Sequence, residues 1–341
     1  MKTSNFDLKL QKFFMPIANK VEQQKHLQAI KDGMIAIVPI IVIGSFFQIP
    51  IALNNLFGGP IHAFLTKHLT GITYGSQFTM GVVSIFATFF IGYNLAKRYN
   101  MKSANMIAIN AVITHLILSV QVTKDGWGIS YLGAEGLFTS IVSAIITVEI
   151  TRFMVNKKLI IKLPDSVPDM VSESFSVLLP LAVTSVIACF ISVGIQSTTG
   201  KVFPAWLMAI LAPVVKSMDT LPAMLIIIFL TQLLWFFGLH GPGITSSVWA
   251  PFAITYGAAN VAAYAAGKPV THFFTFGFYY ALLQVTGSGL TLGLVLLMIK
   301  SKVKSFSSIG KTALVPSIFG INEPVIFGLP IVLNPYMFIP F

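Results

Sequence analysis

The chain has 341 residues, of which 55% are hydrophobic and only 10% are charged. Its mean hydropathy is +0.82. A water-soluble surface normally requires about a quarter of the residues to be charged, so this composition excludes a soluble globule, a disordered chain and a nucleic-acid-binding domain. The sequence therefore predicts an integral membrane protein.

The net charge of +11 is explained by membrane orientation and not by an anionic partner. In membrane proteins, Lys and Arg gather in cytoplasmic loops and set the orientation. Cations cluster near Lys97, in Arg152–Lys162 and in Lys300–Lys311, whereas the loops between these clusters carry few. This pattern predicts a cytoplasmic N-terminus and does not indicate a nucleic-acid partner.

In chain order, residues 1–32 are too polar for a secretory signal, and their apolar residues recur at roughly helical spacing. We expect a cytoplasmic amphipathic segment on the inner membrane face. Residues 33–200 then hold apolar runs long enough to cross a bilayer as helices. These runs are Gly33–Leu53, Gln77–Ala96, Ser103–Val122, Gly136–Val155 and Ser174–Ile195.

Residues 201–341 are less regular. Leu221–Gly238 and Phe273–Ile299 are predicted as spans, and the topology requires a crossing between them. Only Gly243–Gly267, which contains Pro251, is available, either as a weak span or as a re-entrant hairpin. Broken backbone at membrane depth occurs where it is buried in protein or lines a wet cavity, so function is expected in this half.

Glu323 is the one carboxylate after Asp219, and it lies in an apolar run interrupted by glycine and proline. An ionisable group among apolar residues is costly unless it is paired or hydrated, which makes it a functional-site candidate. With Asn322 beside it, the run offers a carboxylate and an amide to a hydroxyl-rich ligand. The alternative is a loop carboxylate in solvent.

His240 is the only side chain between Thr220 and Gly267 that titrates near neutral pH. Its neighbour Gly241 and the other nearby glycines favour an opened backbone beside a cavity, although a lone histidine in a membrane often only joins two helices. Trp235 offers a flat ring on which a sugar could stack, or it faces lipid.

No pattern indicates a metal ion, a cofactor or a catalytic nucleophile on this chain. The single cysteine, Cys189, lies in an apolar run, and there is neither a GxxxxGK[ST] loop nor an HExxH motif. His115 is expected to be a helix contact, and Glu149 and Arg152 a structural ion pair.

The runs GINEPVIFGLPIVLNP (Gly320–Pro335) and WFFGLHG (Trp235–Gly241), with AIKDGMIAIVPIIVIGSFF near the N-terminus, resemble the membrane IIC component of phosphotransferase sugar permeases. The lactose/cellobiose/diacetylchitobiose group is the most similar branch. The resemblance implies an all-α polytopic bundle and a homodimer. It also implies a five-span dimerisation half over residues 33–200 and a transport half over residues 201–341, with broken helices and a re-entrant hairpin holding the NEP motif.

The resemblance further implies the activity and the partners. In a bacterial cell membrane, the protein would bind and translocate a β-linked disaccharide of the cellobiose or diacetylchitobiose type, with lactose less favoured. A cytosolic IIB protein, charged through IIA, HPr and enzyme I from phosphoenolpyruvate, would phosphorylate the sugar. Glu323 and His240 fall on the family's sugar-binding positions, with Asn322, Trp235 and Gly241 beside them.

Two alternatives remain open from the residues. One is a proton-coupled secondary transporter of a polar solute that uses Glu323 or His240. The other is a remnant or sensor without transport, because the sequence stops at Phe341 in an apolar run where family members continue. On this interpretation the transport half is truncated at its C-terminus.

Overall fold

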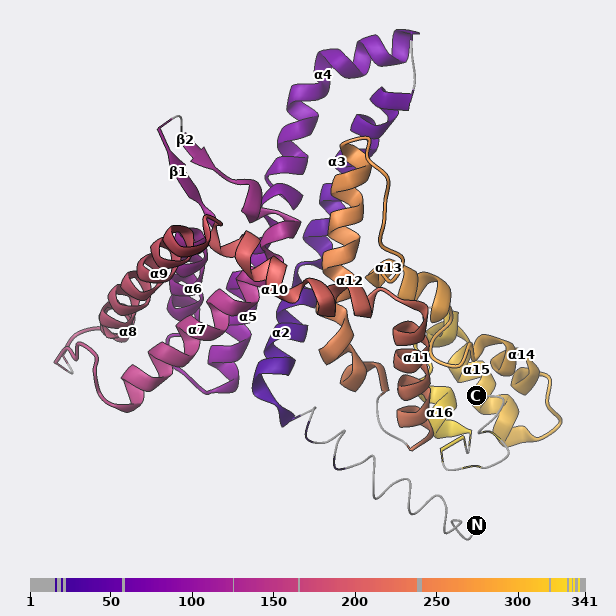
Figure 1. The fold of residues 1–341 in the computed structure, drawn as a ribbon. Helices are drawn as coiled ribbons and strands as arrows, with labels where there is room; N and C mark the ends of the chain where they lie inside the picture. Colours follow the sequence, from indigo (N-terminus) through magenta and orange to yellow (C-terminus); the bar gives the residue numbers. More distant parts are fainter. Residues whose placement is uncertain are drawn as a thin grey trace. The chain divides into compact units, whose positions relative to one another are not determined.

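The computed structural model describes residues 16, 20, 23–56, 59–124, 126–164, 166–237, 241–318, 320–329, 331, 332, 334 and 337. These residues are mostly helical (Figure 1). The chain divides into two compact units. The larger unit comprises Lys25–Lys216 and Ala250–His272, and the smaller unit comprises Ser217–Trp249 and Phe273–Phe341 together with Met1–Gln24.

Regular helices make up most of the larger unit, with a short antiparallel hairpin in which Gln121 pairs with Gly128. The helices and strands from Lys25 to Met218 are α2 (Lys25–Ala36), α3 (Val38–Leu56), α4 (Gly59–Gln77), η1 (Met80–Val82), α5 (Val83–Arg98), α6 (Ala104–Ser119), β1 (Gln121–Thr123), β2 (Gly126–Gly128), η2 (Ser130–Leu132), η3 (Ala134–Gly136), α7 (Leu137–Asn156), α8 (Asp169–Ser176), α9 (Leu178–Thr199) and α10 (Phe203–Met218).

Helix α5 is the centre of the larger unit and packs against α2, α6 and α7. Ser84, Thr88, Gly92 and Ala96 recur every four residues along α5, and all are buried. Small residues at this spacing let helix backbones approach closely, which is how helices associate without a hydrophobic driving force in lipid. The approach is close enough that a Cβ atom on Gly92 would lie 3.2 Å from the Cβ of Ala111 on α6.

Several buried polar groups of the larger unit bind one another. The Ser84 hydroxyl donates to the Leu132 carbonyl at 2.7 Å and lies 2.7 Å from Nε2 of His115, which is fully buried. Because the Ser84 proton is used on Leu132, Nε2 of His115 must donate. The prediction that His115 is a helix contact is therefore confirmed.

Short, broken elements make up most of the smaller unit. The remaining elements of the chain are α11 (Leu221–Phe236), α12 (Gly241–Ala265), α13 (Phe276–Phe278), the π-helix η4 (Tyr279–Leu283), α14 (Leu292–Ile299), α15 (Lys304–Ile318) and α16 (Glu323–Gly328). For Gly243–Gly267 the sequence left a weak span or a re-entrant hairpin open, and residues 243–265 lie within one continuous helix, so the hairpin alternative is not found. Residues 273–299 are not the single predicted span, because left-handed backbone at Thr286–Leu290 divides them.

The described residues contain several helices able to cross a membrane. His62–Arg98, Ala134–Asn156 and Val171–Thr199 are long and apolar enough, and the broken pair of α10 and α11 would add one more. Predicted spans at Gln77–Ala96 and Ser174–Ile195 fall inside these stretches. Helices α4 and α10 were not predicted, and most of the predicted N-terminal segment lies outside the described residues.

Candidate functional site

A cavity of about 460 Å³ lies within the smaller unit. This volume is in the range of about 300 to 1,000 Å³ that is typical of small-molecule pockets. Trp235, from the last turn of α11, and Asn322, which immediately precedes α16, both line it. Two residues that the sequence singled out separately therefore share one cavity. Tyr280, Gln284, Gly287 and Ser288 line it as well.

The turn after η4 supplies one wall, and its backbone is unusual. Four residues there have positive φ, and two of them, Thr286 at 63° and Leu290 at 51°, are not glycine. Such a conformation costs an L-residue about 1 to 2 kcal/mol, and strain of this kind clusters at ligand sites. At Gly287, a Cβ atom would lie 2.8 Å from the Gly320 carbonyl oxygen, so glycine lets this turn reach the segment that carries Asn322.

Hydrogen bonds fix the polar side chains around the cavity. The Asn322 amide donates to the Ser288 carbonyl, and the Ser288 hydroxyl donates to the Gln284 side-chain oxygen. Gln284 is only 5% exposed, and its Nε2 has no hydrogen-bond partner within the described part of the chain. Leaving a buried donor unpaired costs about 1 to 3 kcal/mol. Gln284 lines the cavity, so this unpaired amide donor belongs to a residue of the cavity wall.

Of the other predicted site residues, Gly241 lies beside this cavity, whereas the Glu323 side chain and His240 lie outside the described residues. Gly241 begins α12 against α11, where a Cβ atom would lie 2.1 Å from the Thr231 carbonyl oxygen and 3.1 Å from Trp235 Cδ1. The Glu323 backbone begins α16 next to Asn322, whereas the Glu323 side chain lies outside the described part. His240 also lies outside the described residues.

Sequence reasoning missed Tyr280, Gln284 and Ser288. Gln284 carried a usable signal, because it is a lone amide in an apolar run followed by the glycine-rich stretch TGSGL. Tyr280 and Ser288 carried none, because they reach the cavity only through the π-helix and the left-handed turn. Among the described residues, no three His, Cys, Asp or Glu side chains are grouped closely enough to hold a metal ion.

Comparisons with known proteins agree over nearly the whole chain. The family model described as "Phosphotransferase system, EIIC" matches residues 31–341. The oligo-beta-mannoside-specific EIIC component of Bacillus subtilis is 33% identical over 97% of this chain and 77% of its own length. The cellobiose-specific EIIC component of Geobacillus stearothermophilus is 31% identical over 95% of this chain and 76% of its own length.

One solved structure has the same fold. It is the transporter ChbC, the IIC component from the N,N'-diacetylchitobiose-specific phosphotransferase system, with a TM-score of 0.85 and 30% identity. The match covers 98% of this chain and 81% of that one. The mostly helical membrane architecture predicted from the sequence is confirmed.

Proposed function

Because this chain belongs to the EIIC family of the phosphotransferase system, as a multi-pass membrane sugar permease of the cellobiose/lactose group, we propose that it binds a β-linked disaccharide of the cellobiose or diacetylchitobiose type. A component of this kind implies a sugar substrate and a IIB partner. The disaccharide is carried inward and phosphorylated by IIB. The chain works as a homodimer with its N-terminus in the cytoplasm.

The observation that carries this proposal is the cavity shared by Trp235, Gln284 and Asn322. Sugar hydroxyls both donate and accept hydrogen bonds, so they can satisfy the Gln284 amide donor, while an indole forms an apolar wall for a sugar ring. Glu323 follows Asn322 directly, and His240 precedes Gly241, which packs against Trp235. We assign Glu323 and His240 to hydroxyls of the sugar that receives the phosphate.

The names of the relatives support a β-linked substrate. Oligo-β-mannosides, lactose, lichenan, cellobiose and diacetylchitobiose are among the sugars named for the similar proteins. At about 30% identity the names differ from one relative to the next, so the choice among disaccharides rests on the cavity of this chain. Its mixed amide and aromatic lining suits a pyranose ring, whose hydroxyls form hydrogen bonds with amides while its C–H groups pack against an indole.

Direct binding tests the proposal. Cellobiose, diacetylchitobiose and lactose are titrated by calorimetry into the purified chain in detergent, with Glu323→Gln and His240→Ala beside wild type. Matched controls are Glu135→Gln and His68→Ala, which make the same chemical changes at exposed positions of the larger unit. We expect saturable binding of a β-glucoside that only the first two variants lose. Equal loss in the control variants would contradict the assignment.

Phosphorylation separates this mechanism from proton coupling. In inverted vesicles supplied with IIA, IIB, HPr, enzyme I and phosphoenolpyruvate, the expected product is a disaccharide phosphate, and an uncoupler should leave its formation unchanged. Accumulation of the unmodified sugar that an uncoupler abolishes would contradict the proposal.

A further inference from the structure

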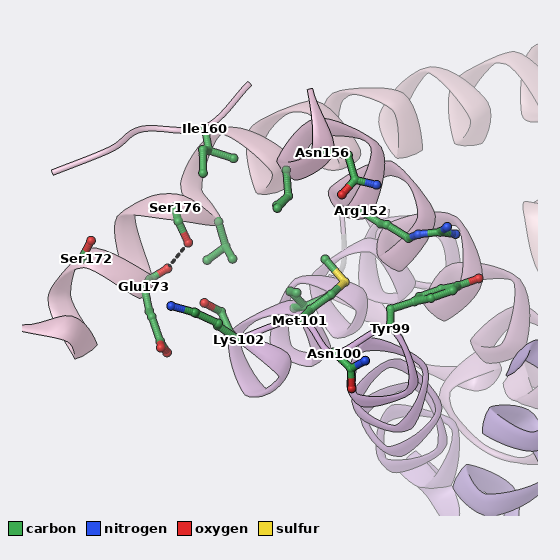
Figure 2. A pocket seen from close by; sticks show the side chains of 14 residues that line it. Tyr99, Asn100, Met101, Lys102, Arg152, Asn156, Ile160, Ser172, Glu173 and Ser176 are labelled. Atoms are coloured by element: carbon green, nitrogen blue, oxygen red, sulfur yellow. Dashed lines mark hydrogen bonds between the residues drawn. The ribbon is translucent and has the colours of Figure 1, made fainter. Parts of the chain in front are cut away.

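The larger unit contains a second pocket, of about 510 Å³, between the loop after α5, the C-terminal end of α7 and α8 (Figure 2). We call it the α7–α8 pocket. Its polar lining includes Asn100, Lys102, Arg152, Asn156, Ser172 and Glu173. It lies within one unit and shares no residue with the sugar cavity.

The depth of this pocket is set by the ends of three candidate spans. His62–Arg98 stops just before the loop that lines it, and Ala134–Asn156 ends at one of its lining residues. Val171–Thr199 begins with α8. Because spans end where the hydrocarbon core gives way to the headgroups, we expect the pocket to lie at headgroup depth.

Helix α8 is amphipathic in the opposite sense to a helix on a soluble protein. Val171 and Phe175, one turn apart, are each 42% exposed. The polar Ser172, Glu173 and Ser176 line the pocket instead. An apolar stripe turned outward beside a polar hollow is typical of a helix that lies in the membrane interface. The occupant must therefore combine a polar head with apolar chains.

The charges in the pocket specify that polar head. Lys102 and Arg152 line it, and exposed Lys157, Lys158 and Lys162 follow α7 closely in sequence. Arginine and lysine bind phosphate oxygens, and basic pockets between membrane helices take phospholipid headgroups. The Glu173 carboxylate on the α8 side accepts hydrogen bonds only, so it suits a headgroup with a hydroxyl beyond its phosphate.

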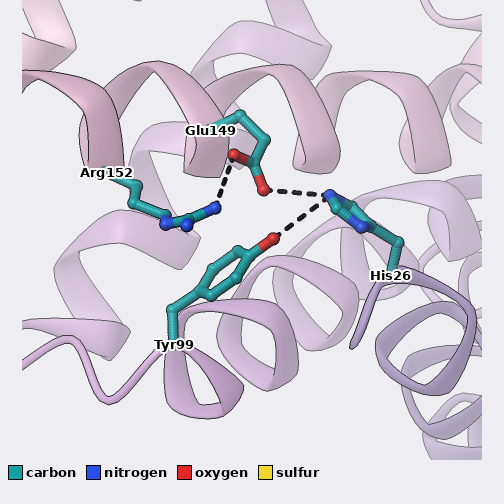
Figure 3. A network of polar contacts seen from close by, with 4 residues as sticks. All are labelled: His26, Tyr99, Glu149 and Arg152. Atoms are coloured by element: carbon teal, nitrogen blue, oxygen red, sulfur yellow. Dashed lines mark hydrogen bonds and ion pairs between the residues drawn. The ribbon is translucent and has the colours of Figure 1, made fainter. Parts of the chain in front are cut away.

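Arg152 is held in place by a network inside the larger unit (Figure 3). Its Nη1 donates to Glu149 Oε2 at 3.1 Å, and its guanidinium lies 4.0 Å from the centre of the Tyr99 ring. Glu149 also contacts Nε2 of His26, at 2.9 Å. Burial, with the hydrogen bond to Glu149 next, raises the pKa of Tyr99 to about 12, so the ring stays neutral. A guanidinium has five N–H donors, which leaves others beyond the one on Glu149.

From this arrangement we infer that the α7–α8 pocket binds one phosphatidylglycerol molecule from the membrane. The Lys102 ammonium, which points toward α8 in Figure 2, binds the phosphate, Glu173 accepts from the glycerol hydroxyls, and the acyl chains lie along Val171 and Phe175. Arg152 and Asn156 line the opposite side of the pocket and add to its polar character. This lipid site is separate from the sugar cavity, so lipid binding does not depend on which sugar is transported.

The test uses native mass spectrometry of the full-length chain in detergent, titrated with palmitoyl-oleoyl-phosphatidylglycerol. We compare wild type, Lys102→Gln and Lys102→Arg with Lys201→Gln, which makes the same charge change after the far end of α9. One lipid should bind per chain. Lys102→Gln should weaken it about five-fold, whereas Lys102→Arg and Lys201→Gln should leave it unchanged.

Three results would overturn the inference. Equal weakening by Lys102→Gln and Lys201→Gln would mean that only overall charge matters. Displacement of the lipid by inorganic phosphate at the same concentration would mean that the pocket takes a free anion. Binding of purified IIB protein that Lys102→Gln abolishes, with lipid binding unchanged, would make the pocket a protein docking site.

Discussion

Among the described residues, both compact units keep some buried hydroxyls unpaired, Thr139 and Thr151 in the larger unit, but only the smaller unit has unpaired side-chain amides. In the larger unit, Ser84 links His115 to the Leu132 carbonyl, and the Thr147 hydroxyl donates to Thr114 at 2.9 Å. In the smaller unit, the side-chain amides of Gln232 and Gln284 each keep one buried atom without a partner among the described residues. Polar groups that bind one another stabilise a fold, whereas unpaired ones are available to a ligand.

The backbones differ in the same way. Helices α5, α6 and α7 run unbroken through the larger unit, while the smaller unit has a π-helix and a turn with four positive φ angles. Strain and unpaired groups both lower stability and persist where function needs them. Substitutions in the two units should therefore have different effects. Those in the core of the larger unit should change stability, and those around the cavity of the smaller unit should change sugar affinity.

The largest expected effect is in the packing of the larger unit. A Cβ atom on Gly33 of α2 would lie 2.6 Å from the Ile91 backbone nitrogen of α5, which cannot move aside easily. We expect Gly33→Ala to destabilise by about 1–3 kcal/mol or more. The control is Gly71→Ala in α4, where nothing lies within 4 Å and alanine should add about 0.5–1 kcal/mol. Thermal unfolding in detergent measures both.

Loss of a polar link should come next. Ser84→Ala removes the hydroxyl between His115 and Leu132, and leaves two buried groups unpaired. The expected cost is about 1–3 kcal/mol in thermal unfolding, with sugar affinity unchanged. A drop in sugar affinity at unchanged stability would break the division between the units.

Sequence reasoning succeeded where long-range packing was not needed. Apolar length alone located the membrane helices around Gln77–Ala96 and Ser174–Ile195, because a span must be long and uncharged. It failed at residues 273–299, where hydropathy is uniform but glycines at positive φ break the helix. Hydropathy measures transfer into lipid and carries no information on backbone torsion.

The candidate site was predictable only in part, for a similar reason. Trp235 was singled out as a flat ring close to His240 in sequence, and Asn322 as the amide beside Glu323, and both line the cavity. That they meet depends on the close approach of Gly287 to Gly320, which no local pattern encodes. Gln284 joined them through the turn that this approach permits.

An intermediate effect should appear at Gln284, on sugar binding more than on stability. Gln284→Met keeps the volume and removes the unpaired donor, but it also removes the oxygen that accepts from the Ser288 hydroxyl. The free energy of unfolding should therefore fall by about 1 kcal/mol, while sugar affinity should fall about ten-fold, the value of one hydrogen bond. The control is Gln28→Met in α2, where the side chain is equally buried at 4% exposed. That variant should lose stability and keep its affinity. The reverse pattern would refute the assignment of Gln284.

The smallest effect should come from a charge next to the most sensitive glycine. Asp32 of α2 pairs with Arg98 of α5, and both side chains are about one-third exposed. Exposed ion pairs contribute about 0–1 kcal/mol and weaken with salt. Asp32→Asn should therefore change thermal unfolding by less than about 1 kcal/mol, and by less still in high salt. Asp32 and Gly33 are adjacent and both contact α5, so the two variants distinguish charge from close packing. If Asp32→Asn lowered the free energy of unfolding as much as Gly33→Ala, charge and not close packing would hold α2 against α5.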